Sequence, residues 1–201
     1  MNKYKKIIFY IIVVSTIFFT LVQQFGNPKL FFVDKDNIEL KAGRYKAGKD
    51  IPIGVYDVEV IKGSICYGGT KLEKGEKFIA DYLGKNYIVD IEGSGTVMLQ
   101  QHHIQEIKKV DGIYTIKNNG NYKIGQHLEE GKYEIKYFNP KSKLEDDSAF
   151  IDIENDDSKP RGLYLKHLEN EIITLNNDET LQVFMGLFDK CEDSYIELKR
   201  Q

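Results

Sequence analysis

One stretch of sixteen residues occurs twice in the chain, at 45–60 and again 77 positions later at 122–137. Tyr45, Lys46, Gly48, Gly54 and Tyr56 in the first copy align with Tyr122, Lys123, Gly125, Gly131 and Tyr133 in the second. Glycine reaches positive φ without a clash at Cβ, so the two glycines are expected to bracket a turn. The shared residues therefore constrain the backbone and its packing, and they do not identify a ligand.

The second glycine of each copy begins an alternating pattern. Tyr56, Val58 and Val60 fall on one face of an extended chain, and Asp57 and Glu59 fall on the other. The second copy alternates in the same way, with Tyr133, Ile135 and Tyr137 on the apolar face. This period of two is typical of a half-buried strand.

Further turn signals follow at short intervals, and no segment of helix length between 43 and 100 keeps a period of 3.6. We therefore predict an all-β fold of two related β-sandwich-like repeats. A turn is expected at 92–95, and 104–110 is ambiguous between a strand and a helical turn. Residues 31–42 are expected to run into a first strand, with the folded region beginning near Ile38. The further predicted strands are 55–61, 64–67, 77–82, 87–91, 96–100, 113–117, 132–138, 149–153, 171–175, 180–184 and 195–199.

The second repeat is longer than the first. Residues 72–80 align with 175–183 at an offset of 103, so about 26 extra residues lie between Phe138 and Thr174. This insertion is rich in acidic residues, and we expect it to form a surface loop that carries specificity. The predicted boundaries are an anchor at 1–25, a tether at 26–37, a first repeat at 38–110 and a second repeat at 111–201. Whether the repeats share one core is open.

The N-terminus has the pattern of a membrane-targeting segment. Residues 7–22 carry no charge, and Lys3, Lys5 and Lys6 precede them. Basic residues stay on the cytoplasmic side, so the C-terminal part is predicted to be extracellular. Cleavage as a signal peptide followed by secretion is the alternative. We favour an uncleaved single-pass transmembrane helix, because no small-residue cleavage site follows.

The net charge argues against a nucleic-acid partner. All 31 acidic residues follow Leu30, whereas four of the 28 basic residues precede it, which leaves 24 basic residues and a net charge of −7. An acidic domain is repelled by a phosphate backbone, and no basic stripe with interleaved aromatic residues occurs.

The string Gly43-x-Tyr45-x-x-Gly48-x-Asp50-Ile51-Pro52-x-Gly54-x-Tyr56-Asp57 resembles a module of exported proteins and lipoproteins of Gram-positive bacteria. The resemblance covers about 43–100 well and the remainder loosely. It implies a small extracytoplasmic β domain of unknown function, and it supplies no catalytic residues.

Residues for catalysis or metal binding are sparse. Cys66 is expected within a strand and a turn, where nothing lowers a thiol pKa, and its pairing with Cys191 in a disulfide is open. His102 and His103 are adjacent and would point to opposite faces of a strand, so they would not chelate one ion together. We therefore predict no catalytic residue, no enzyme activity and no cofactor.

A calcium site is the weak exception. Asp152, Glu154 and Asp156 alternate as calcium ligands do, but the glycine and the final glutamate of an EF-hand loop are missing. The simpler interpretation is a solvated acidic loop.

These observations favour a binding or interaction module of the cell envelope over an enzyme. Its partner would be a cell-wall component or an envelope protein. The alternatives are an accessory subunit that docks through a β edge and, more weakly supported, a cell-wall hydrolase that uses Cys66 or acidic residues. The tyrosines that would offer aromatic platforms to a ligand are Tyr67, Tyr82, Tyr87, Tyr137 and Tyr164.

Overall fold

The computed structural model describes residues 37–142, 147–155, 159–186 and 193–201, all within one unit, Lys35–Gln201. The described residues form strands and no helix, so the all-β prediction is confirmed. The strands are β1 (Asn37–Lys46), β2 (Gly54–Lys62), β3 (Ser64–Tyr67), β4 (Thr70–Glu73), β5 (Lys77–Leu83), β6 (Ile88–Gln101), β7 (Ile113–Ile116), β8 (Asn119–Lys123), β9 (Gly131–Phe138), β10 (Ser148–Glu154), β11 (Arg161–Lys166), β12 (Asn170–Leu175), β13 (Thr180–Phe184) and β14 (Tyr195–Arg200).

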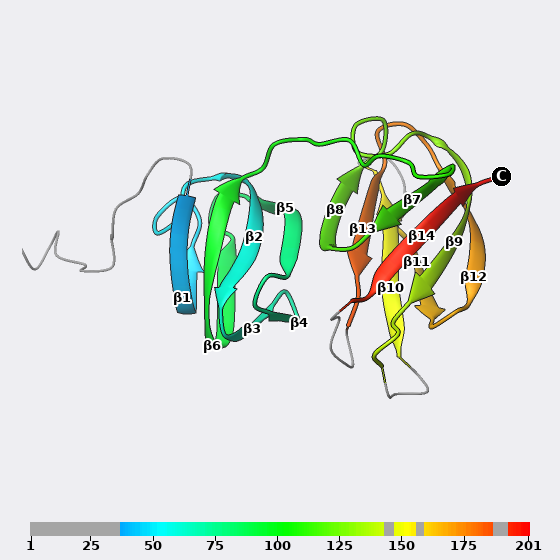
Figure 1. Cartoon of the computed structure of the whole chain (residues 1–201). Helices are drawn as coiled ribbons and strands as arrows, with labels where there is room; N and C mark the ends of the chain where they lie inside the picture. Colours follow the sequence, from blue (N-terminus) through cyan, green and yellow to red (C-terminus); the bar gives the residue numbers. More distant parts are fainter. Residues whose placement is uncertain (1–36, 143–146, 156–158, 187–192) are drawn as a thin grey trace, which may run out of the picture. The chain divides into compact units, whose positions relative to one another are not determined.

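The strands form two sheets (Figure 1). The ten-stranded sheet has the order β11-β10-β13-β8-β5-β2-β6-β3-β4, and β1 pairs with β6. The four-stranded sheet has the order β12-β9-β14-β7. Between the named strands the pairs are antiparallel except β5 with β8, where Phe78 lies opposite Asn119 and Ile79 opposite Gly120. This short parallel contact joins the strands of the first repeat to those of the second.

Each predicted strand lies within or over an observed one, but the expected turn at 92–95 is wrong. β6 runs through these residues and pairs there with β3, at Glu92 and Gly93. On its other edge the pairing with β1 skips them, because the register shifts between Lys41, opposite Thr96, and Gly43, opposite Ile91. Gly93 takes a φ of 106°, and a Cβ there would lie 2.7 Å from the Ser64 carbonyl oxygen. The glycines therefore permit a bulge and a close approach of two backbones within one long strand.

The insertion in the second repeat is not simply a surface loop. β10 and β11 form a hairpin within it, and Ala149, Ile151, Ile153 and Leu165 of this hairpin are buried.

Residues 102–109 differ from both alternatives considered for the linker, because they have no regular secondary structure. β4, β8 and β11 were not predicted at all.

The Gly-x-Tyr elements of the repeat have one common geometry. In both copies the hydroxyl of the second tyrosine donates to the carbonyl four residues earlier, from Tyr56 to Pro52 at 3.2 Å and from Tyr133 to Glu129 at 2.9 Å. The first tyrosines of the copies make the same bond, from Tyr45 to Lys41 and from Tyr122 to Asn118.

The glycine two positions before the second tyrosine of each copy makes room for the ring. A Cβ on Gly54 would lie 3.1 Å from the ring of Tyr56, and one on Gly131 would lie 3.4 Å from the ring of Tyr133. The motif is therefore a structural device that folds the tyrosine back over its own turn.

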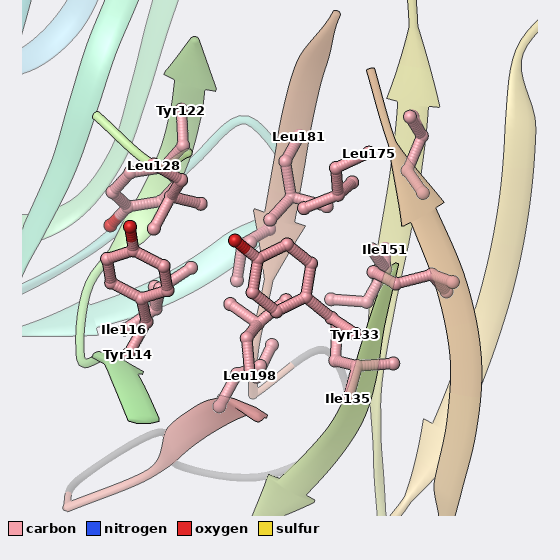
Figure 2. Close-up of a cluster of buried hydrophobic side chains, with 14 of the residues drawn as sticks. Tyr114, Ile116, Tyr122, Leu128, Tyr133, Ile135, Ile151, Leu175, Leu181 and Leu198 are labelled. Atoms are coloured by element: carbon pink, nitrogen blue, oxygen red, sulfur yellow. The ribbon is translucent and has the colours of Figure 1, made fainter. Parts of the chain in front are cut away.

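The buried apolar residues form two clusters, one from the first repeat and one from the second. The second cluster draws residues from both sheets, and Figure 2 shows Tyr114, Tyr133, Leu181 and Leu198 within it. At about 25 cal/mol per Å² of apolar surface, burial of such side chains is the main stabilising contribution to the fold. The domain boundaries stay predictions.

No helix in the described part of the chain is long and apolar enough to cross a membrane. The predicted anchor at 1–25 and most of the tether lie outside the described residues.

Candidate functional site

A pocket of about 260 Å³ opens beside the β3–β4 hairpin. The hairpin turn is Gly68-Gly69, and both residues have positive φ, as a tight two-residue hairpin turn requires. β3 pairs with β6 only as far as Tyr67 opposite Ile91, so the start of β6 continues beyond the hairpin. The pocket lies in this space, and its lining consists of Cys66, Tyr67, Gly68, Gly69, Tyr87, Ile88, Val89, Asp90 and Glu92.

A buried phenol and a carboxyl group meet at Tyr67. The Tyr67 hydroxyl donates a short hydrogen bond to Asp81, and only 4% of Tyr67 is exposed. Burial, and then the charge of Asp81, raise the pKa of Tyr67. Burial also raises the pKa of Asp81, although its hydrogen bond from Tyr67 opposes this shift. The raised pKa of each group favours its protonated form relative to the free side chain.

A bulge in β5 places Asp81 against Tyr67. Ala80 has a φ of 55°, which is unusual for a residue with a Cβ, and the β2–β5 register shifts beside it. Because of this bulge, Phe78 and Asp81 both reach Tyr67 although they are three residues apart. The Ala80 N–H donates to Asp57 Oδ1 at 2.9 Å, which stabilises the unusual backbone.

The rest of the lining adds an aromatic ring and acidic groups. Tyr87 is half exposed, and burial and the charge of Asp81 raise its pKa. Asp90 and Glu92 contribute carboxylates. Aromatic rings bind the apolar faces of sugars and of other ligands, and carboxylates accept hydrogen bonds from hydroxyl and amino groups. The pocket therefore suits a ligand that combines an apolar face with hydroxyl or amino groups.

The tyrosines expected as platforms divide into two sets. Tyr82, Tyr87 and Tyr164 are exposed, whereas Tyr67 and Tyr137 are buried, and Tyr137 belongs to the second core. As platforms, Tyr67 and Tyr137 were therefore wrong choices. Tyr67 still lines the pocket, beside Tyr87.

Cys66 also lines the pocket, but no histidine is among the lining residues. Thiol catalysis needs a base within hydrogen-bond reach. The acidic residue directly opposite Cys66 across the strand pair is Glu92. Cys191 lies outside the described residues, so its pairing with Cys66 stays a prediction.

Two of the three calcium candidates lie on one strand. Asp152 and Glu154 lie on β10, and Gln182 donates to the carboxylate of Glu154. Asp156 lies outside the described residues. Among the residues that the structure describes, no group of three or more histidine, cysteine, aspartate or glutamate side chains is arranged to hold a metal ion.

Three side chains that sequence analysis did not connect form a hydrogen-bonded chain, Asp57–His102–His127. His102 Nδ1 lies 2.7 Å from Asp57 Oδ1, and His102 Nε2 lies 3.1 Å from His127 Nε2. Lys123 donates its backbone N–H to His127 Nδ1 at 2.8 Å. These contacts link β2 of the first repeat to the turn of the second.

The direction of donation along these hydrogen bonds follows from the Lys123 N–H, which can only donate. His127 Nδ1 must accept, so the proton of neutral His127 is on Nε2 and is donated to His102 Nε2. His102 then has its proton on Nδ1 and donates to Asp57. Burial, and then His102, lower the pKa of His127, which favours this neutral form.

The alignment of the two repeats contained one indication of this hydrogen-bonded group. His127 aligns with Asp50, and the Asp50 carboxylate accepts the equivalent backbone hydrogen bond from Lys46 at 2.9 Å. An acceptor at this position was therefore predictable. Nothing in the sequence indicated that His102 and Asp57 would meet it.

No protein-family model, curated protein or solved structure matches the chain. No relative therefore supplies a function for it, and the resemblance of the Gly-x-Tyr repeat to the Gram-positive module stays an expectation.

Proposed function

We propose that the chain is a membrane-anchored binding module on the outside of a bacterial cell, built from two β-sandwich-like repeats. Residues 1–25 would anchor it with the N-terminus in the cytoplasm. The support is the uncharged run at 7–22 behind three lysines. The β repeats would recognise a component of the cell envelope.

The Tyr67–Tyr87 pocket carries the proposal. Its lining combines a half-exposed tyrosine, Tyr87, with the recessed Tyr67, whose hydroxyl is bonded to Asp81, and with the carboxylates of Asp90 and Glu92. A wall glycan or wall peptide has the matching chemistry, because it presents hydroxyl or amino groups beside apolar faces. Recognition, without turnover, is the function that these residues support.

The test is binding of the full-length protein, in a non-ionic detergent, to purified cell wall and to soluble wall fragments. We expect retention on wall, and we expect Tyr87→Ala to weaken it about tenfold, as loss of a central aromatic contact does in other complexes. Tyr82→Ala is the matched control, because Tyr82 is exposed but does not line the pocket. Equal binding by the wild type and Tyr87→Ala would contradict the assignment.

An accessory role in an envelope complex is the second candidate. β11 is the last strand of the ten-stranded sheet, and it carries the exposed Tyr164. An edge strand offers unpaired backbone groups to an added strand. Capture of one envelope protein, without binding to cell wall, would favour this role. Replacement of Leu163 by proline should then abolish the capture.

A further inference from the structure

A second pocket, of about 190 Å³, lies at the β1–β2 loop, and three lysines are among its lining residues. Lys46 is the last residue of β1, Lys49 lies in the loop, and Lys85 comes from the turn between β5 and β6. Ile53, half of which is exposed, supplies an apolar wall. None of its residues lines the Tyr67–Tyr87 pocket.

The three lysines have no acidic partner among the described residues, in a unit whose other cations are often paired. The nearest acid along the chain is Asp50. Its carboxylate accepts the backbone N–H of Lys46 at 2.9 Å and so belongs to the loop itself. Three neighbouring ammonium groups repel one another, and a bound anion would relieve this repulsion.

The equivalent loop of the second repeat is closed. The backbone of the two loops is the same: Gly48 donates to Ile51 and Gly125 donates to Leu128, both at 2.7 Å. A Cβ on Gly125 would collide with Asn177, whereas one on Gly48 would make only ordinary contacts with Ile53 and Lys85.

The second loop also offers fewer lysine ammonium groups to a ligand than the first. Lys123, the counterpart of Lys46, donates to the Asp178 carbonyl oxygen, and Gln126 stands where the first loop has Lys49. The same turn therefore has an open, basic pocket in one repeat and a filled, less basic one in the other.

We propose that the open pocket binds a phosphate group. Lys46, Lys49 and Lys85 would pair with the phosphate oxygens, and Ile53 would contact the apolar part of the phosphate ester. This site goes beyond the binding function proposed above and does not depend on it. A phosphate in this setting comes either from a lipid headgroup or from a small phosphate ester.

The experiment uses the full-length protein in a non-ionic detergent with three probes: inorganic phosphate, glycerol 3-phosphate and a soluble short-chain phosphatidylglycerol. Binding is followed by amide chemical shifts. We expect Gly48 and Asn86 to shift and the equivalent Gly125 to stay unchanged. The lipid probe binding most tightly would identify a headgroup as the source, and equal affinity for both esters would identify a small ester.

The variant is Lys49→Gln/Lys85→Gln, which leaves the backbone of the loop intact. We expect roughly a hundredfold weaker binding, since each charge-assisted hydrogen bond contributes about tenfold. Lys108→Gln/Lys117→Gln is the control, because it removes the same charge from exposed positions outside the pocket. Failure of all three probes to bind, or equal losses in the two variants, would overturn the proposal, whatever the outcome with cell wall.

Discussion

His127 holds in the second repeat the place that Asp50 holds in the first. Each accepts the backbone N–H of the lysine four residues earlier, Asp50 through Oδ2 at 2.9 Å and His127 through Nδ1 at 2.8 Å. The imidazole has a second nitrogen, and this nitrogen reaches His102 at 3.1 Å. The exchange of a carboxylate for a ring thus keeps the turn and adds a link to the first repeat.

The first prediction separates these two roles of His127. In His127→Asn the amide oxygen keeps an acceptor near the Lys123 N–H, but the shorter side chain does not reach His102. We expect a loss of about 1–3 kcal/mol in the free energy of unfolding, because His102 Nε2 loses its partner. His127→Leu removes both contacts, and we expect a larger loss. Urea denaturation measures both, and equal losses would show that the turn does not need an acceptor.

The second prediction concerns pH. The pKa of His127 is lowered in the folded protein from its ordinary 6.5, so below about pH 6.5 the unfolded chain binds more protons than the folded one. The contribution of His127 to stability is therefore present above pH 6.5 and is lost as the pH falls through the folded pKa. Protonation of His127 also removes the acceptor for the Lys123 backbone N–H. The groups around His127 are His102, which contacts Asp57, and the ring of Tyr122.

The measurement is the free energy of unfolding at pH 7.5, 6.5 and 5.5 for the wild type and for His127→Asn. We expect the difference between them to shrink as the solution becomes acidic. Other groups titrate in both proteins and cancel in this difference, including Asp81, whose pKa is raised. A difference that stays constant with pH would mean that His127 does not titrate in this range.

The strands were predictable where turn residues precede an alternation of apolar and polar residues. β2 and β9 are examples, and the burial of their side chains alternates as the sequence does. β8 was not, because Asn119-Gly-Asn-Tyr-Lys123 lacks an apolar alternation and owes its strand conformation to pairing with β13 and β5. The turn at 92–95 failed for a related reason. Its glycines permit close backbone approach within a strand, and a short window cannot distinguish this from a turn.

The candidate site was predictable only in part. Cys66, Tyr67 and Tyr87 were singled out by residue type, and all three line one pocket. The place of Asp81 against Tyr67 could not be predicted from the sequence, because it depends on the bulge at Ala80. The lysine pocket escaped notice because Lys85 is far in the sequence from Lys46 and Lys49.

The third prediction concerns Gly120, where β8 meets β5. Its φ is 137°, and a Cβ there would overlap with the backbone nitrogen and carbonyl oxygen of Ile79. Gly120→Ala therefore forces the two strands apart, and we expect a loss of several kcal/mol in stability. Gly68→Ala is the control. It has positive φ but open space, so it should cost about 1 kcal/mol. Equal thermal unfolding midpoints for the two variants would contradict the close approach.

The fourth prediction tests the coupling of Tyr67 with Asp81. Tyr67→Phe removes the hydroxyl and leaves a buried carboxyl group without its phenol donor, so we expect a loss of about 1–3 kcal/mol at pH 7. The loss should lessen as the pH is lowered, because a protonated Asp81 has no charge to keep buried. In the double variant Tyr67→Phe/Asp81→Asn the neutral amide removes that charge at every pH. Its unfolding free energy should therefore not show the acid recovery of Tyr67→Phe, and the two single losses should not add. Additive losses, with the same pH dependence in Tyr67→Phe and in the double variant, would mean that the two side chains are energetically independent.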